Sequence, residues 1–257
     1  MKSLFFLLLM SSVVVAQVPQ DVNQVPSYLQ DVSVTIKAGF SQGSGVIVRK
    51  GNNDFVLTAA HVVKGLRKVR TSIENKQEVK IIEFDDATIM QVVIYEGRTV
   101  GRIEYQAKVV KYSDADNGYD VAVLQIRKPL AFDKHIEFYK DNIIPPVLSD
   151  VLHCGSLLGE DGANSVTKGS ISQHGRIINN RVLDQVSVGA FPGSSGGGIY
   201  DKNGYWIAML VRGAGETFNL VTPIRELKVW AKDNNLMWLF DDSEHPSQSD
   251  IDKILVE

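Results

Sequence analysis

The segment Phe191–Tyr200, FPGSSGGGIY, contains the residue types that a nucleophile loop needs. A serine hydroxyl is a poor nucleophile at neutral pH unless an adjacent base accepts its proton and a third group orients that base. The glycines around Ser195 permit backbone geometries that a side chain would block, and the N–H groups of Gly193 and Ser195 are the expected oxyanion hole. Because glycine-rich loops also form plain turns, the loop predicts catalysis only together with a base and an acid.

His61 is the preferred base, because it lies in FVLTAAHVV, where an apolar strand ends in small residues that allow close packing. Asp120 is the preferred orienting acid, because it opens DVAVLQI and is therefore expected to be buried beside apolar strand residues. The chain order His61, Asp120, Ser195 is that of one of the unrelated catalytic-triad lineages. The remaining histidines lie in predicted strand, turn, connection and tail positions: His135, His153, His174 and His245.

These motifs resemble the trypsin-like serine proteases, and within them the HtrA-type branch. The resemblance covers about residues 31–232: GSGVIV and DFVLTAAHVV resemble the histidine region, YDVAVLQI the aspartate strand, CGSLLG with SVTKGSIS the opening of the second barrel, GSSGGGIYDKNGYWIAML the serine loop with its hairpin, and NLVTPI the strand before the last helix. It implies a serine endopeptidase with His61, Asp120 and Ser195 as catalytic triad, acting through an acyl-enzyme without a cofactor. It also assigns the nucleophile to Ser195 and not to Ser194.

The resemblance further predicts how the protein is activated and which substrates it prefers. Ser194 stands where digestive relatives carry an aspartate that pairs with a freshly cut N-terminus, so no such cleavage is expected. Gly189 is expected at the base of the primary pocket, where it offers no carboxylate to a substrate Lys or Arg. A pocket wall formed by Met209, Leu210 and Val211 favours an apolar substrate residue. Only about 25 residues follow the last predicted helix, too few for a PDZ domain.

Many short apolar runs separated by turn signals such as KGNND, DADNG and DKNG predict an all-β protein. With the resemblance, the expected fold is two six-stranded antiparallel β-barrels with a C-terminal helix, and with the site between them. Thr222 is the expected N-cap of that helix and Pro223 its first residue. The expected divisions are a signal peptide (1–16), a linker (17–30), the first barrel (31–130), the second barrel with the helix (131–240) and a solvated acidic tail (241–257). An extended hairpin is expected around 83–101.

Composition excludes several other classes of function. A net charge of −3 without a long basic run argues against nucleic-acid binding, and one cysteine, Cys154, argues against a zinc or iron–sulfur site and excludes an internal disulfide. The turn 114–120 does not match a calcium loop, because Tyr119 occupies the place of the required glycine. No metal is therefore expected.

The N-terminal run LFFLLLMSSVVVA after Lys2 predicts a signal peptide, with cleavage after Ala16, and an uncleaved anchor is the alternative. The expected location is secreted or periplasmic, without stable membrane insertion after cleavage. The expected partners are protein or peptide substrates, and the sequence does not predict the oligomeric state. The competing interpretations are a non-catalytic peptide-binding relative of the same fold and a viral or phage processing protease.

Overall fold

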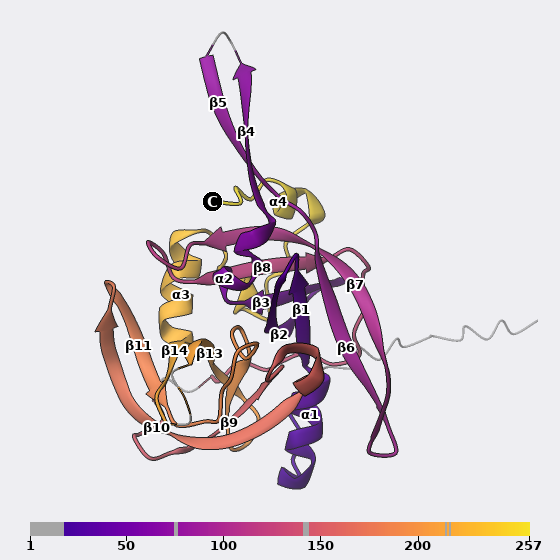
Figure 1. Ribbon diagram of the computed structural model, residues 1–257, viewed down its shortest axis with the longest axis vertical. Helices are drawn as coiled ribbons and strands as arrows, with labels where there is room; N and C mark the ends of the chain where they lie inside the picture. The colour runs from indigo at the N-terminus through magenta and orange to yellow at the C-terminus, as the bar shows by residue number, and fades with distance from the viewer. Residues whose placement is uncertain (1–17, 75–76, 141–143, 214, 216) are drawn as a thin grey trace, which may run out of the picture.

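The short strands predicted from the sequence form two closed antiparallel barrels in the computed structural model (Figure 1). The structure describes residues 18–74, 77–140, 144–213, 215 and 217–257, so the predicted signal segment lies outside the described residues. The predicted fold class, two six-stranded barrels followed by a helix, is confirmed.

The first barrel has the strand order β1-β2-β3-β8-β7-β6. Its bounds are β1 Ser33–Ala38, β2 Ser41–Lys50, β3 Asn53–Thr58, β6 Ala87–Tyr95, β7 Arg98–Ser113 and β8 Val121–Ile126. β8 follows the predicted Asp120 directly, and all six of its residues are buried. Such continuous burial is expected for a β-branched, apolar strand with neighbours on both sides, and it fixes the start of β8 firmly in the barrel.

The second barrel has the strand order β10-β11-β14-β13-β12-β9. Its bounds are β9 Asp150–Gly155, β10 Ser165–Ile178, β11 Arg181–Val186, β12 Gly198–Asp201, β13 Trp206–Gly213 and β14 Asn219–Pro223. β12 begins three residues after Ser195, so the predicted nucleophile loop is the connection that enters this strand. The described residues also contain four 3-10 turns: Val22–Gln24, Lys64–Leu66, Gly159–Gly162 and Met237–Leu239.

The C-terminal helix α3, Ile224–Asp233, differs from the prediction at its start. Pro223 is the N-cap rather than the first helical residue, and it still pairs with Ala208 in the sheet. Thr222 therefore belongs to β14, opposite Met209, and its buried hydroxyl makes no hydrogen bond within the described residues. The pairing of β13 with β14 therefore extends through Thr222 and Pro223, which the sequence analysis had assigned to the start of the helix.

The predicted linker contains a helix, α1, Val25–Asp31. Tyr28 and Leu29 are fully buried, because the apolar residues of α1 recur at helical spacing and face the core. The Tyr28 hydroxyl donates to the carbonyl of His135 (2.9 Å), and the Asn164 side-chain amide donates to the carbonyl of Gln30 (2.9 Å). This helix thus joins the inter-barrel connection and the second barrel instead of being a free linker.

The predicted solvated tail is also ordered against the first barrel. Helix α4, Gln248–Asp252, begins with a capping box between Ser247 and Asp250. Ile251 is 2% exposed and belongs to the main hydrophobic core. Most residues of this segment are exposed, as expected for a solvated end, but Ile251 and the capped helix attach it to the core.

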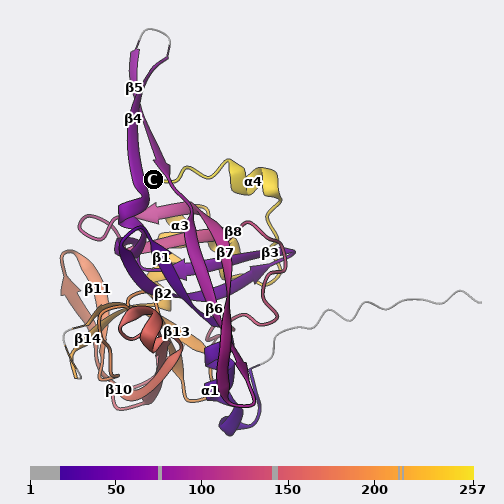
Figure 2. The same ribbon diagram turned by 45° about the vertical axis from the view of Figure 1, so that its right-hand side comes forward.

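Two hairpins extend from the first barrel in different directions, as Figure 2 shows. One is formed by β6 and β7 and covers most of the predicted hairpin region 83–101. The other is a separate two-stranded sheet of β4, Arg67–Glu74, and β5, Gln77–Phe84, which pair with each other only. The predicted hairpin region overlaps β5 only at residues 83–84, so the sequence prediction did not separate this second hairpin from the first.

Candidate active site

His61 lies in a single helical turn, α2, Ala60–Val63, which is separated from β3 by one residue, Ala59. Val62 and Val63 are buried and fix this turn to the first barrel, whereas the His61 side chain remains 37% exposed. The small residues before His61 are completely buried, in agreement with the close packing that the sequence suggested. The imidazole is therefore anchored through its neighbours and accessible through its ring.

Asp120 is the direct partner of His61. Its carboxylate lies 3.0 and 3.1 Å from the ring Nδ1 and also accepts the backbone N–H of His61 (3.0 Å). Asp120 is 3% exposed and has a φ of 54°, a left-handed conformation that costs a non-glycine residue about 1–3 kcal/mol. The paired carboxylate favours the tautomer with the proton on Nδ1, so that Nε2 can accept a proton.

Ser195 approaches the His61 segment from the second barrel. Its carbonyl accepts the backbone N–H of Ser44 (2.7 Å), and the following Gly196 donates to the carbonyl of Leu210 (2.7 Å). A Cβ added to Gly43 would lie 2.5 Å from Val62 Cγ2 and 3.1 Å from the Ser195 carbonyl oxygen. Gly43 is therefore between the His61 turn and the Ser195 loop. Among the described contacts, the Ser195 hydroxyl makes no hydrogen bond with His61.

Ser44 is a site residue that the sequence reasoning missed. Its hydroxyl donates to the Gly193 carbonyl (2.7 Å) and accepts the N–H of Ser156 (2.7 Å), and its own carbonyl accepts the Thr58 hydroxyl (2.7 Å). This fully buried side chain of β2 therefore links the first barrel to the Ser195 loop and to the loop after β9. The available signal was the serine between two glycines in GSGVIV.

The backbone at Gly193, a predicted oxyanion donor, has a conformation that favours glycine. Gly193 has a φ of 97°, and an added Cβ would lie 2.3 Å from the Ser156 carbonyl oxygen, so only glycine fits without displacement. The preceding carbonyl, of Pro192, is held by the N–H of Leu158 (2.7 Å). Within the described chain, the N–H groups of Gly193 and Ser195 donate to no protein acceptor. Both donors are therefore available to a developing negative charge.

The structure separates the four residues predicted for the primary pocket. Gly189 is half-buried, and its carbonyl accepts the Thr167 hydroxyl (2.9 Å). Met209 and Val211 pack into the main core, whereas Leu210 packs into the separate core of the second barrel. Their side chains thus do not all face one pocket, because successive residues of a strand point to opposite faces.

Asn219 is a second residue that the sequence reasoning did not single out. It is fully buried and donates to the carbonyl of Val188 (2.6 Å). A Cβ added to Gly213 would lie 3.2 Å from its Oδ1 and 3.7 Å from Ala190 Cβ. Asn219 therefore introduces a polar group beside Gly213 and Ala190.

The other candidates for chemistry have structural partners or are buried. His174 forms a second histidine–aspartate pair with Asp184 (3.0 Å), but its Nε2 contacts the Pro145 carbonyl (2.9 Å) and Arg225 also pairs with Asp184. Burial raises the pKa of the Cys154 thiol to about 12, so it remains a protonated core residue. Among the described residues, no three His, Cys, Asp or Glu side chains form a group that could hold a metal ion.

Comparison with known proteins identifies the family of this chain. Residues 43–209 match the trypsin-like peptidase domain family. A serine protease Do-like HtrA of Lactobacillus helveticus is 25% identical over 178 residues, which cover 66% of this chain and 35% of that protein. The chain thus spans about a third of the length of this relative.

Solved structures show the same fold. The crystal structure of Deg5 has a TM-score of 0.60 and 21% identity, with 84% of this chain and 94% of that chain covered. The serine endoprotease from Yersinia pestis has a TM-score of 0.60 and 20% identity, with 88% and 69% covered. At these identities the likeness shows the architecture alone.

Proposed function

Because the chain belongs to the trypsin-like peptidase family, we propose that it is a serine endopeptidase whose nucleophile is Ser195. The observation that supports this most is the contact of His61 Nδ1 with the buried Asp120 carboxylate, at 3.0 Å, in the turn beside the Ser195 loop. A second histidine–aspartate pair exists at His174, but its Nε2 is engaged by a carbonyl. His61 is therefore the histidine suited to accept a proton.

The proposed reaction has two half-steps. Ser195 Oγ attacks the scissile carbonyl carbon while His61 Nε2 takes the hydroxyl proton, and the N–H groups of Gly193 and Ser195 stabilise the oxyanion. The intermediate collapses as His61 returns this proton to the leaving amine, which leaves an acyl-enzyme. Water then attacks the acyl carbon with His61 again as base, and Ser195 is regenerated. Asp120 holds the imidazole orientation throughout.

We further propose that the substrates are exported or extracellular proteins. The support is the apolar run after Lys2, which has the length and small-residue ending of a signal peptide. Over the described residues, no helix has both the length and the apolar character that a membrane crossing demands. Fractionation of cells that express the full chain, with N-terminal sequencing, tests this proposal; cytoplasmic protein that retains Met1 would contradict it.

A fluorophosphonate probe tests the nucleophile directly. The unmodified protein should be labelled on Ser195, and Ser195→Ala should reduce the labelling rate by about 10⁴-fold or more while circular dichroism stays unchanged. Ser194→Ala is the matched control, because the Ser194 hydroxyl is buried and accepts the N–H of Phe191 (3.1 Å). It should still be labelled. A folded protein that resists the probe would instead support a non-catalytic peptide-binding relative.

A further inference from the structure

The turn that presents Asp120 is organised by Asp114. The Asp114 carboxylate accepts the N–H groups of Asp116 (2.7 Å) and Asn117 (3.4 Å), and its carbonyl accepts those of Gly118 (2.8 Å) and Asp120 (3.4 Å). The backbone bond from Asp116 is the main cause that lowers the pKa of Asp114, so this carboxylate is ionised at neutral pH. The Asp114 carboxylate thus holds the start of the turn, at Asp116 and Asn117, and its backbone carbonyl holds the end of the turn that leads into the strained Asp120.

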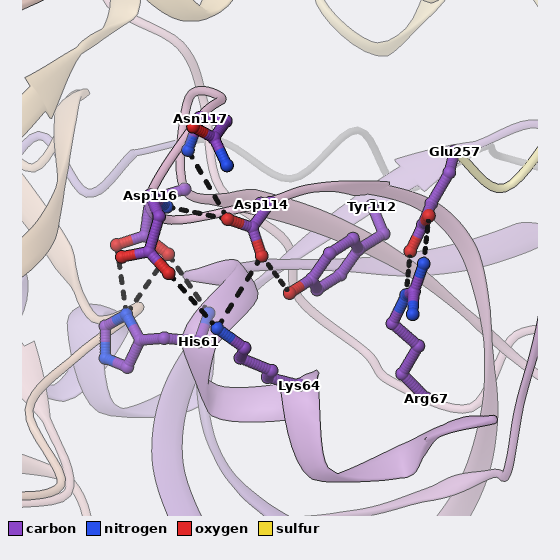
Figure 3. Close-up of polar contacts among 9 residues, drawn as sticks. His61, Lys64, Arg67, Tyr112, Asp114, Asp116, Asn117 and Glu257 are labelled. Atoms are coloured by element: carbon purple, nitrogen blue, oxygen red, sulfur yellow. Dashed lines mark hydrogen bonds and ion pairs between the residues drawn. The ribbon is translucent and has the colours of Figure 1, made fainter. Parts of the chain in front are cut away.

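Tyr112 holds Asp114 from the end of β7. Its hydroxyl donates to the Asp114 carboxylate (3.2 Å), as Figure 3 shows, and its ring packs on Phe84 with 5.1 Å between ring centres. Tyr112 is 4% exposed, so the ring has little freedom to move. Lys64, three residues after His61, contacts Asp116 (3.2 Å) and Asp114 (3.8 Å). The turn is therefore fastened both to β7 and to the His61 segment.

Residues 248–257, here called the terminal segment, complete this support. β6 pairs with β7 only as far as Ala107, and beyond that point the carbonyl of Val256 accepts the N–H of Tyr112 (2.7 Å). Lys111 donates to the carbonyl of Leu255 (3.0 Å), and Arg67 forms a double ion pair with Glu257 (Figure 3). The terminal segment thus covers the part of β7 that carries Tyr112.

We propose that Tyr112 and Asp114 are positioning residues for Asp120, and that the terminal segment holds them in place. This inference rests on the proposed function, because it gives the segment a role in aligning the His61–Asp120 pair. A series of contacts supports it: the Tyr112 N–H donates to the Val256 carbonyl, the Tyr112 hydroxyl to the Asp114 carboxylate, and the Asp120 N–H to the Asp114 backbone carbonyl, while the Asp120 carboxylate contacts His61. None of the first three residues touches the atoms that react.

The test uses the rate constant and the dissociation constant of fluorophosphonate inactivation. Tyr112→Phe keeps the ring against Phe84 but removes the bond to Asp114, and it should lower the maximal inactivation rate about tenfold while probe affinity stays the same. Tyr105→Phe is the matched control, because Tyr105 lies on the same strand and its hydroxyl donates to the carbonyl of Ala131 (2.9 Å). Removal of residues 248–257 should act in the same direction as Tyr112→Phe.

Asp114 provides a test by conservative rescue. Asp114→Ala should slow inactivation and displace the His61 Nδ1 proton resonance, whereas Asp114→Asn should recover much of the rate because its oxygen can still accept the N–H of Asp116. Circular dichroism first establishes whether the protein without residues 248–257 is folded. If it is unfolded, Tyr112→Phe and Asp114→Ala decide whether the proposal holds.

The outcomes separate the two proposals. If the unmodified protein resists the probe, the proposed function fails and this inference fails with it. If it reacts, but Tyr112→Phe and Asp114→Ala react equally fast, only the positioning role is overturned. The same conclusion follows if Tyr105→Phe slows inactivation as much as Tyr112→Phe.

Discussion

His153 is a buried histidine beneath the Ser195 loop, and its protonation should weaken the folded protein. Its Nδ1 contacts the Gly198 carbonyl (3.0 Å), which requires a proton on Nδ1, while Nε2 is buried without a partner among the described residues. A Cβ added to Gly197 would lie 2.6 Å from the ring. Burial lowers the pKa of His153 to about 4, because a second proton would place a charge in this dry environment.

The sign of the pH effect follows from the lowered pKa. The unfolded chain binds the proton near pH 6.5 and the folded chain only near pH 4, so this stability is present above pH 6.5 and is lost as the pH falls toward 4. We expect the free energy of unfolding to drop by about 2 kcal/mol between pH 7 and pH 5 from this residue. Urea unfolding of the protein and of His153→Asn at both pH values measures the difference.

His245→Asn is the control, because His245 is exposed and should leave the pH difference unchanged. Burial also lowers the pKa of His135 to about 4, but this residue is present in every variant and its contribution cancels. An equal loss of stability in His153→Asn and in the unmodified protein would contradict the assignment.

Replacement of Ser44 should lower activity, although Ser44 is not one of the proposed catalytic residues. Ser44→Ala leaves the Gly193 carbonyl and the Ser156 N–H without their partner, which should cost about 1–3 kcal/mol of stability. Because Gly193 is a proposed oxyanion donor, the rate of fluorophosphonate labelling should fall about tenfold. The control is Ser187→Ala, whose hydroxyl accepts the N–H of Ser170 (3.0 Å). Equal labelling by both variants would remove Ser44 from the site.

At the scale of elements, the β4–β5 hairpin should be dispensable for the fold. Among the described residues it pairs with no other strand, and Val69 and Ile73 in β4 are 53% and 79% exposed. An isolated two-stranded sheet gains little stability in water. Replacing residues 69–82 by an Asn-Gly turn keeps Phe84 against Tyr112 and should change the free energy of unfolding by less than about 1 kcal/mol.

Urea unfolding and fluorophosphonate labelling of this deletion check the expectation. A matched shortening of the β6–β7 hairpin tip, residues 94–99, provides a comparison in a sheet that belongs to the barrel. A large loss of stability or labelling on removal of β4–β5 would show that the hairpin supports the barrel beneath it.

The strands of both barrels could be predicted because their residues are apolar over the length of a strand and are bounded by turn residues. The helix α1 was missed because Pro26 and the polar residues around it suggested a linker, although Val25, Tyr28 and Leu29 recur at helical spacing. Composition could not predict that α4 packs on the rest of the protein, because this packing depends on the burial of one side chain, Ile251.

The site was predictable to a similar extent. His61 and Asp120 could be paired from their strand contexts, and the structure brings them into contact. Ser44 and Asn219 form hydrogen bonds to the carbonyls of Gly193 and Val188, which lie far away in the sequence, and no local pattern contains such a partner. The alternation of β13 side chains between two cores likewise needs the closed barrel to be known.

At the scale of the molecule, the two barrels should unfold together. One hydrophobic cluster contains residues of both, including Val34 and Leu57 from the first and Tyr200 and Met209 from the second. Ser44 and helix α1 add hydrogen bonds across the same boundary. A shared core makes partial unfolding expose apolar surface on both sides, which favours an all-or-none transition.

Thermal unfolding followed by far-ultraviolet circular dichroism, tryptophan fluorescence and residual fluorophosphonate labelling should therefore give one coincident midpoint. The calorimetric and van't Hoff enthalpies should agree, as expected for two states. Two resolved transitions, with labelling lost in the first, would show that the barrels are independent despite the common cluster.

The rate at which the Cys154 thiol is chemically modified reports how often the structure around it opens. Its thiol is fully buried in β9, directly opposite Gly198, three residues beyond Ser195. Because only a solvent-accessible thiolate reacts quickly with a disulfide reagent, modification of Cys154 must wait until β9 separates from its neighbours. With no other thiol in the sequence to compete, the time course of a single-site modification reads out how often the second barrel opens under native conditions.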